Sequence, residues 1–204
     1  LCCENKLQRL PALPGICLQQ LDASHNELES VKDLLDNCGT DLKIIRLHNN
    51  QLQTLPLSLA KQTKLQKLTL HHNQLTEVPD DCWPRVTDGH MSEITLHHNL
   101  LRTVPIRLLQ MPLTILDLSY NQLQVLPPDL CNLAGLQDLN LSHNQLRELP
   151  AGIGRISGLA SLDLRHNLLT TLPEGLLPPP RNHRINIGGV ETVINASATL
   201  KISH

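Results

Sequence analysis

The histidines of this chain follow a regular pattern, and their imidazoles are the side chains best suited to chemistry. Eight of the eleven histidines fall at two positions, numbered 7 and 8, of a repeated segment. Position 7 holds Ser24, His48, His71, His97, Ser119, Ser142 and Arg165. Position 8 holds His25, Asn49, His72, His98, Tyr120, His143 and His166. Imidazole titrates at about pH 6.5 and also ligates zinc, copper and nickel.

Three interpretations of His48, His71 and His97 follow from this chemistry. On adjacent strands the three side chains would lie roughly 5 Å apart. They would form a neutral polar stripe that contacts a partner, a pH-sensitive patch, or a metal site. No motif with fixed ligand geometry supports a metal, so we expect no metal or other cofactor. The interpretation that we favour is the polar stripe.

Position 5 of the same segment adds a pattern of charge. It reads Asp22, Arg46, Thr69, Thr95, Asp117, Asn140 and Asp163. A partner with basic groups would meet the later repeats more favourably, unless the column is simply a solvated polar face. The chain has no Gly-rich phosphate loop, nucleophile elbow or metalloprotease helix motif, so we expect no enzyme activity.

These positions are set by a repeat of about 23 residues. Residues 136–150 read LQDLNLSHNQLRELP, residues 113–127 read LTILDLSYNQLQVLP, and residues 159–173 read LASLDLRHNLLTTLP. The central Leu-x-Leu has the period of a strand with one apolar face, which must be buried by stacking unit on unit in a parallel sheet. The inward pairs are Leu21/Ala23, Ile45/Leu47, Leu68/Leu70, Ile94/Leu96, Leu116/Leu118, Leu139/Leu141 and Leu162/Leu164.

An asparagine follows each predicted strand, where the chain must turn. These residues are Asn26, Asn50, Asn73, Asn99, Asn121, Asn144 and Asn167. Their amides can bond the backbone of neighbouring turns and form a ladder through the stack. The Leu-Pro that comes next begins a return leg of short helices or 3₁₀ turns on the convex side.

The predicted fold class is therefore α/β: a curved solenoid with a parallel concave sheet. We place the repeat domain at residues 1–177, and a degenerate repeat or tail at 178–204, where Ile185 and Ile187 suggest an eighth strand and Val190 replaces the asparagine. An insertion follows Val78. Its Trp83 either packs against the convex helices or anchors a partner.

The segments SHNQLRELP (142–150) and SYNQLQVLP (119–127) resemble leucine-rich repeats. The likeness is to the 23-residue subclass found in Ras-pathway scaffolds, plant Ras-group-related proteins and Scribble–Erbin-type scaffolds. It implies that the concave sheet holds another protein. The outward columns then supply the site: Arg46, His48, Thr69, His71, His72, Thr95, His97, His98, Asp117, Tyr120, Asn140, His143, Asp163 and Arg165.

The function expected is a non-enzymatic scaffold for protein partners in intracellular signalling. Net charge is −2, which argues against nucleic acid, and no apolar run is long enough to span a membrane. Cysteines at apolar return-leg positions and the absence of capping cysteine clusters favour the cytoplasm. Because the chain starts inside a unit, at Leu1, we expect a monomeric domain of a longer chain. Two alternatives stay open: the recognition arm of a Roco-type kinase or a leucine-rich-repeat phosphatase, and an extracellular receptor fragment.

Overall fold

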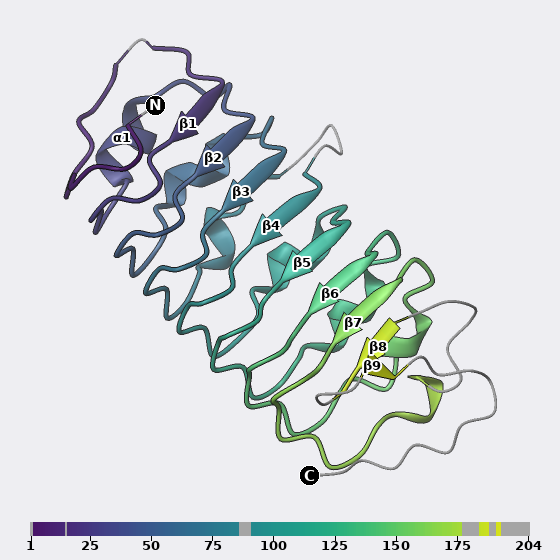
Figure 1. Cartoon of the computed structure of the whole chain (residues 1–204). Coiled ribbons are helices and arrows are strands. Elements are labelled where there is room, and N and C mark those ends of the chain that lie inside the picture. The colour runs from purple at the N-terminus through teal and green to yellow at the C-terminus, as the bar shows by residue number, and fades with distance from the viewer. Residues whose placement is uncertain (1, 15, 86–90, 177–183, 188–190, 193–204) are drawn as a thin grey trace.

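One open sheet organises the molecule, in strand order identical to chain order (Figure 1). The computed structural model describes residues 2–14, 16–85, 91–176, 184–187 and 191–192. Within them the strands are β1 (Gln20–Asp22), β2 (Ile44–Arg46), β3 (Lys67–Thr69), β4 (Glu93–Thr95), β5 (Ile115–Asp117), β6 (Asp138–Asn140), β7 (Ser161–Asp163), β8 (Arg184–Asn186) and β9 (Glu191–Thr192). Strands β1 to β8 are parallel, and β9 pairs antiparallel with β8.

The register of the sheet repeats without a slip from strand to strand. Leu21 lies beside Ile45, which lies beside Leu68, and the same pairing continues to Leu162 and Ile185. Equivalent repeat positions therefore form straight columns across the sheet. The predicted parallel sheet is confirmed, and β8 extends it as the spacing of Ile185 suggested.

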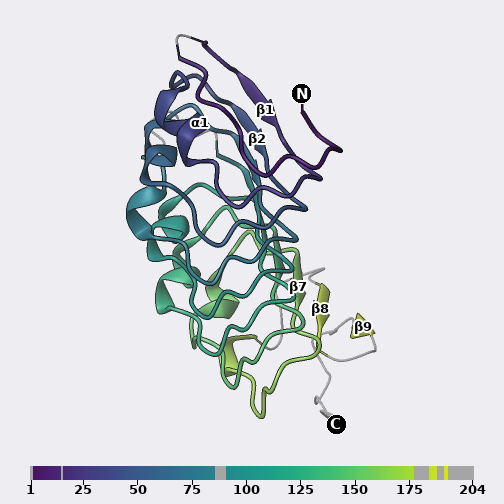
Figure 2. The same cartoon turned by 90° about the vertical axis from the view of Figure 1, so that its left-hand side faces the viewer.

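Short helices cover one face of the sheet and leave the other face open (Figure 2). They are α1 (Lys32–Asn37) and the 3₁₀ turns η1 (Leu57–Lys61), η2 (Asp80–Cys82), η3 (Ile106–Gln110), η4 (Pro128–Asn132), η5 (Ile153–Arg155) and η6 (Glu174–Leu176). Five of the 3₁₀ turns start directly after a proline, at Pro56, Pro79, Pro105, Pro127 and Pro173. Proline has a fixed φ and no N–H, and both properties suit the start of a helical turn.

The core is a sandwich of leucines between these two layers. Each predicted inward pair is buried; Leu68, Leu70, Leu116 and Leu118, for example, are all 0% exposed. Burying one such side chain contributes about 1.5–3 kcal/mol, so stacking the units supplies most of the stabilisation.

The asparagine ladder is present as predicted. Asn121 Nδ2 donates to the carbonyl of Leu96 in the preceding unit (3.0 Å) and to that of Leu118 in its own unit (3.1 Å). Its Oδ1 accepts from the backbone N–H of Leu101 (3.0 Å). Equivalent bonds run from Asn26 to Asn167. Each asparagine thus satisfies buried peptide groups that the turn leaves without sheet partners.

Two predictions concern parts of the chain away from the regular repeats. Trp83 is only 3% exposed and belongs to the core, so the alternative that it anchors a partner is wrong. The proposed domain boundary after residue 177, and Val190, lie outside the described residues.

Candidate functional site

The outward columns of the sheet form what we call the sheet face: positions 3, 5, 7, 8 and 10 of each repeat. Position 5 is the last residue of each strand from β1 to β7, and positions 7 and 8 follow at the turn. The predicted site residues all lie on this face in three neighbouring columns. Their mutual contacts differ between the repeats that have a histidine at position 7 and those that have another residue there.

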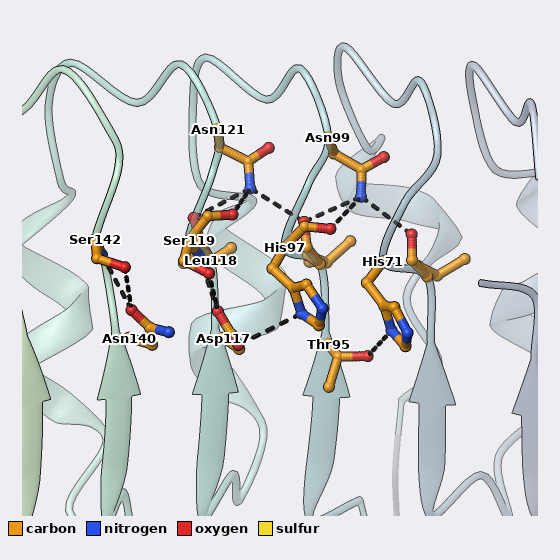
Figure 3. A network of polar contacts seen from close by, with 12 residues as sticks. His71, Thr95, His97, Asn99, Asp117, Leu118, Ser119, Asn121, Asn140 and Ser142 are labelled. Carbon is orange, nitrogen blue, oxygen red and sulfur yellow. Dashed lines mark hydrogen bonds and ion pairs between the residues drawn. The ribbon is translucent and has the colours of Figure 1, made fainter. Parts of the chain in front are cut away.

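Where position 7 is a histidine, its imidazole reaches across to position 5 of the next strand. His48 Nδ1 lies 3.0 Å from Thr69 Oγ1, and His71 Nδ1 lies 3.0 Å from Thr95 Oγ1. In the next repeat His97 Nδ1 lies 3.4 Å from Asp117 Oδ2, without hydrogen-bond geometry, and forms an ion pair when protonated. Figure 3 shows the last two of these contacts side by side.

In the repeats without a histidine at position 7, including the first, the residue at position 7 bonds to position 5 of its own strand. Ser119 donates to Asp117 Oδ1 through its hydroxyl (2.7 Å), and Ser142 donates to Asn140 Oδ1 in the same way (2.8 Å), as Figure 3 also shows. Arg165 binds Asp163 through Nε and Nη2. Serine is too short to span to the next strand, whereas an imidazole can.

From His72 to His166, position 8 forms a continuous stack of rings. The ring centroids of His72, His98, Tyr120, His143 and His166 are separated in turn by 4.2, 4.0, 3.9 and 4.1 Å. Every residue of this column from His25 to His166 has a positive φ, between 51° and 54°. Non-glycine residues adopt this left-handed conformation at a cost, with Asn and His among the more tolerant types. Because the rings face each other, they present mainly their edges to a partner.

The imidazoles of position 7 form a second, shorter stack. The His48 and His71 rings are 4.4 Å apart and the His71 and His97 rings 4.3 Å apart, with interplanar angles of 13° and 10°. Burial, followed by repulsion from the neighbouring imidazoles, lowers the pKa of His71 to about 3. Burial also lowers the pKa of His48 and of His97, although Asp117 opposes the shift at His97. These rings are therefore neutral at neutral pH.

Charges on the sheet face are largely compensated within the chain. Arg46 lies 3.7 Å from Asp22, and Lys67 is paired with Glu93 at 2.7 Å. Since Asp163 is held by Arg165, the acidic character predicted for the later repeats rests mainly on Asp117 and Asp138.

Some predicted site residues lie beneath the exposed side chains of the sheet face and cannot contact a partner directly. Thr69 is 5% exposed beneath His48, so its hydroxyl orients the imidazole. Conversely, the prediction omitted position 3, where the Lys67–Glu93 pair bridges β3 and β4 and Ile115 is 40% exposed. The alternation of the strand does place that column on the same face, because positions 3 and 5 point the same way, but its residues were left out of the predicted site.

A metal site finds no support among the described residues, since no group of three His, Cys, Asp or Glu side chains has the geometry to hold an ion. All six cysteines are free thiols, and Cys82 is buried in the core. Among the described residues no helix is both long and apolar enough to cross a bilayer.

Sequence comparison gives a consistent picture. Two family models with the description leucine rich repeat match the chain, one over residues 89–146 and 111–169 and the other over 64–85. Mouse osteomodulin is 36% identical over 81 residues, covering 38% of this chain and 19% of osteomodulin. Rat osteomodulin is 32% identical over 128 residues, covering 59% and 29%. The chain thus spans less than a third of these curated relatives.

Solved structures share the fold. A leucine-rich repeat protein of Leptospira interrogans superposes with a TM-score of 0.73 at 29% identity, covering 82% of this chain and 42% of that one. Toll, in the Drosophila Toll–Spatzle complex, gives a TM-score of 0.72 at 31% identity, covering 83% and 23%. The family matches point to the same fold as the parallel sheet and the asparagine ladder. The chain belongs to the leucine-rich repeat proteins.

Proposed function

We propose that this chain is a non-enzymatic module that binds a protein partner on its sheet face, in the cytoplasm and as part of a signalling pathway. The observation that carries the proposal is the order of the outward side chains. They are neither solvated at random nor gathered into a catalytic group; two ring stacks and a series of hydrogen bonds hold them in fixed columns.

Such order favours association because binding then immobilises fewer side chains. Ordering a free side chain at an interface costs about 0.5–1.5 kcal/mol, and here the repeat has already ordered them. Tyr120 is 43% exposed in the middle of the longer stack, and tyrosine is a frequent binding hot spot. The Toll–Spatzle complex gives one example of a structurally similar chain in a protein complex.

The chain itself suggests substitutions that should alter the face and keep the fold. Serine occupies position 7 in three repeats and asparagine occupies position 8 at Asn49. The variant H71S/H97S/Y120N therefore uses residue types that these columns already accept. A matched control is Lys61→Glu, an exposed residue in η1 on the helical face.

The experiment is an affinity capture from cell lysate with the wild-type chain and both variants, followed by a binding titration with the purified partner. We expect the wild type and K61E to retain the same protein, and the triple variant to lose at least tenfold in affinity while its circular dichroism is unchanged. Equal retention by the triple variant would move the binding site away from the sheet face.

The cytoplasmic location and the repeat subclass rest on other observations. Six free thiols are consistent with a reducing compartment. Alkylation of the denatured chain isolated from cells should therefore modify all six, and any disulfide would favour the extracellular alternative. The Leu-Pro motif and the spacing near 23 residues support the Ras-scaffold-like subclass.

A further inference from the structure

The position-7 stack brings three imidazoles into direct ring-to-ring contact. Adjacent rings are 4.3 to 4.4 Å apart and nearly parallel. His71 is in the middle, its Nδ1 against the hydroxyl of Thr95 and its two ring faces against His48 and His97. We call His48, His71 and His97 the histidine triad.

The groups around the triad set how it responds to protons. Among the described residues, the titratable and charged side chains that lie around it on the sheet face are Asp22, His25, Arg46, Lys67, His72, Glu93, His98 and Asp117. Arg46 and Lys67 are paired with Asp22 and Glu93 respectively. Asp117 is the carboxylate closest to the triad, and it stands beside His97, at one end.

This arrangement makes the two ends differ from the middle. A proton on His97 is stabilised by Asp117, whereas a proton on His71 would meet two imidazole neighbours and a neutral hydroxyl. Even in the dielectric of water, two unit charges 4.3 Å apart lower proton affinity about fivefold, and the effect is larger for half-buried groups. The triad can therefore hold protons at its ends only while its middle ring stays neutral.

We propose that the histidine triad makes the sheet face a proton-responsive binding surface: it is uncharged and stacked at neutral pH, where a partner docks, and becomes cationic at acidic pH, where the partner is released. The part of this inference that concerns docking and release of a partner rests on the proposed function. A partner that covers the triad removes water from the rings and further disfavours their charged forms. Protons and partner must then compete, because binding equilibria that share a group are linked.

The first test needs no partner. The ring resonances of all histidines are titrated by two-dimensional ¹H–¹³C NMR in the wild type, in H48S/H97S and in the control His143→Asn, which alters only the longer stack. We expect His71 in the wild type to remain neutral below pH 5. In H48S/H97S its pKa should rise by about 1, because two charged neighbours are gone. In the control it should not change.

The second test uses the partner captured at pH 7.5 by the wild-type chain. We expect at least a tenfold loss of retention at pH 5.0, where circular dichroism must show the chain still folded. Retention that is unchanged or increased at pH 5.0 would overturn the release mechanism. A His71 that titrates near 6.5, or whose pKa does not respond to H48S/H97S, would overturn the triad itself. Failure of any capture at pH 7.5 would refute the proposed function and the release mechanism, while the NMR result still decides the triad.

Discussion

Replacing Asn121 with alanine tests how the repeats are held together at their turns. Asn121 lies in the middle of the ladder and is 7% exposed. Its Oδ1 accepts from the N–H of Leu101, and its Nδ2 donates to the carbonyls of Leu96, Leu118 and Ser119 at 3.0 to 3.1 Å. Alanine removes all four contacts and leaves the backbone in place.

The cost depends on which backbone groups keep another partner. The carbonyl of Leu96 also accepts from Asn99, that of Leu118 from Asn144, and that of Ser119 from the N–H of His98. Each of these three carbonyls therefore loses one of its two hydrogen bonds, at a cost of about 0.5 kcal/mol, and keeps the other. The N–H of Leu101 is left without an acceptor in a buried position, which costs about 1–3 kcal/mol. We expect Asn121→Ala to lower the free energy of unfolding by about 2.5–4.5 kcal/mol.

A matched control is Asn167→Ala, at the end of the ladder. Asn167 makes the same contacts but is half-exposed, so water can replace the amide, and we expect a loss under about 1.5 kcal/mol. Urea unfolding followed by circular dichroism measures both, with unchanged m values as the check on cooperativity. If Asn121→Ala cost less than about 1 kcal/mol, or no more than Asn167→Ala, the ladder would not be the stabilising element that we describe.

Three further results follow from the structure. The free energy of unfolding should fall as the pH drops below 6.5. The pKa of His71 is lowered to about 3 in the folded chain, so the stability that comes from keeping this ring neutral is present above pH 6.5 and is lost towards pH 3. Urea midpoints at pH 7.5 and 5.0 measure this loss, and equal midpoints would contradict it. His143→Val should cost about 1–2 kcal/mol more than His143→Asn in the same unfolding assay, because a β-branched residue resists the φ of 52° at this position. Burial raises the pKa of Cys82 to about 12, so in the native chain a thiol reagent at neutral pH should modify the exposed Cys17 and spare Cys82, as peptide mass spectrometry would show.

Much of the fold could be predicted because leucine, asparagine and proline recur at fixed positions of each repeat. Leu116 and Leu118 must turn inward together, since alternate residues of a strand share a face, and Asn121 must follow them where the chain turns. Proline at Pro127 then starts the return leg. Each inference uses only local geometry and the need to bury leucine, so one repeat predicts the next.

The sequence by itself therefore determined the columns. It determined which residues face outward and that His48, His71 and His97 lie in one column. Only the tertiary structure decided what each side chain in a column touches. His71 reaches Thr95 on the next strand, whereas Ser119 bonds back to Asp117 on its own. Serine bonds back because its hydroxyl is too short to cross the spacing between strands, whereas Arg165 bonds back because the carboxylate of Asp163 lies on its own strand. The tertiary structure also hides Thr69 beneath a ring and stacks three imidazoles that come from three different repeats.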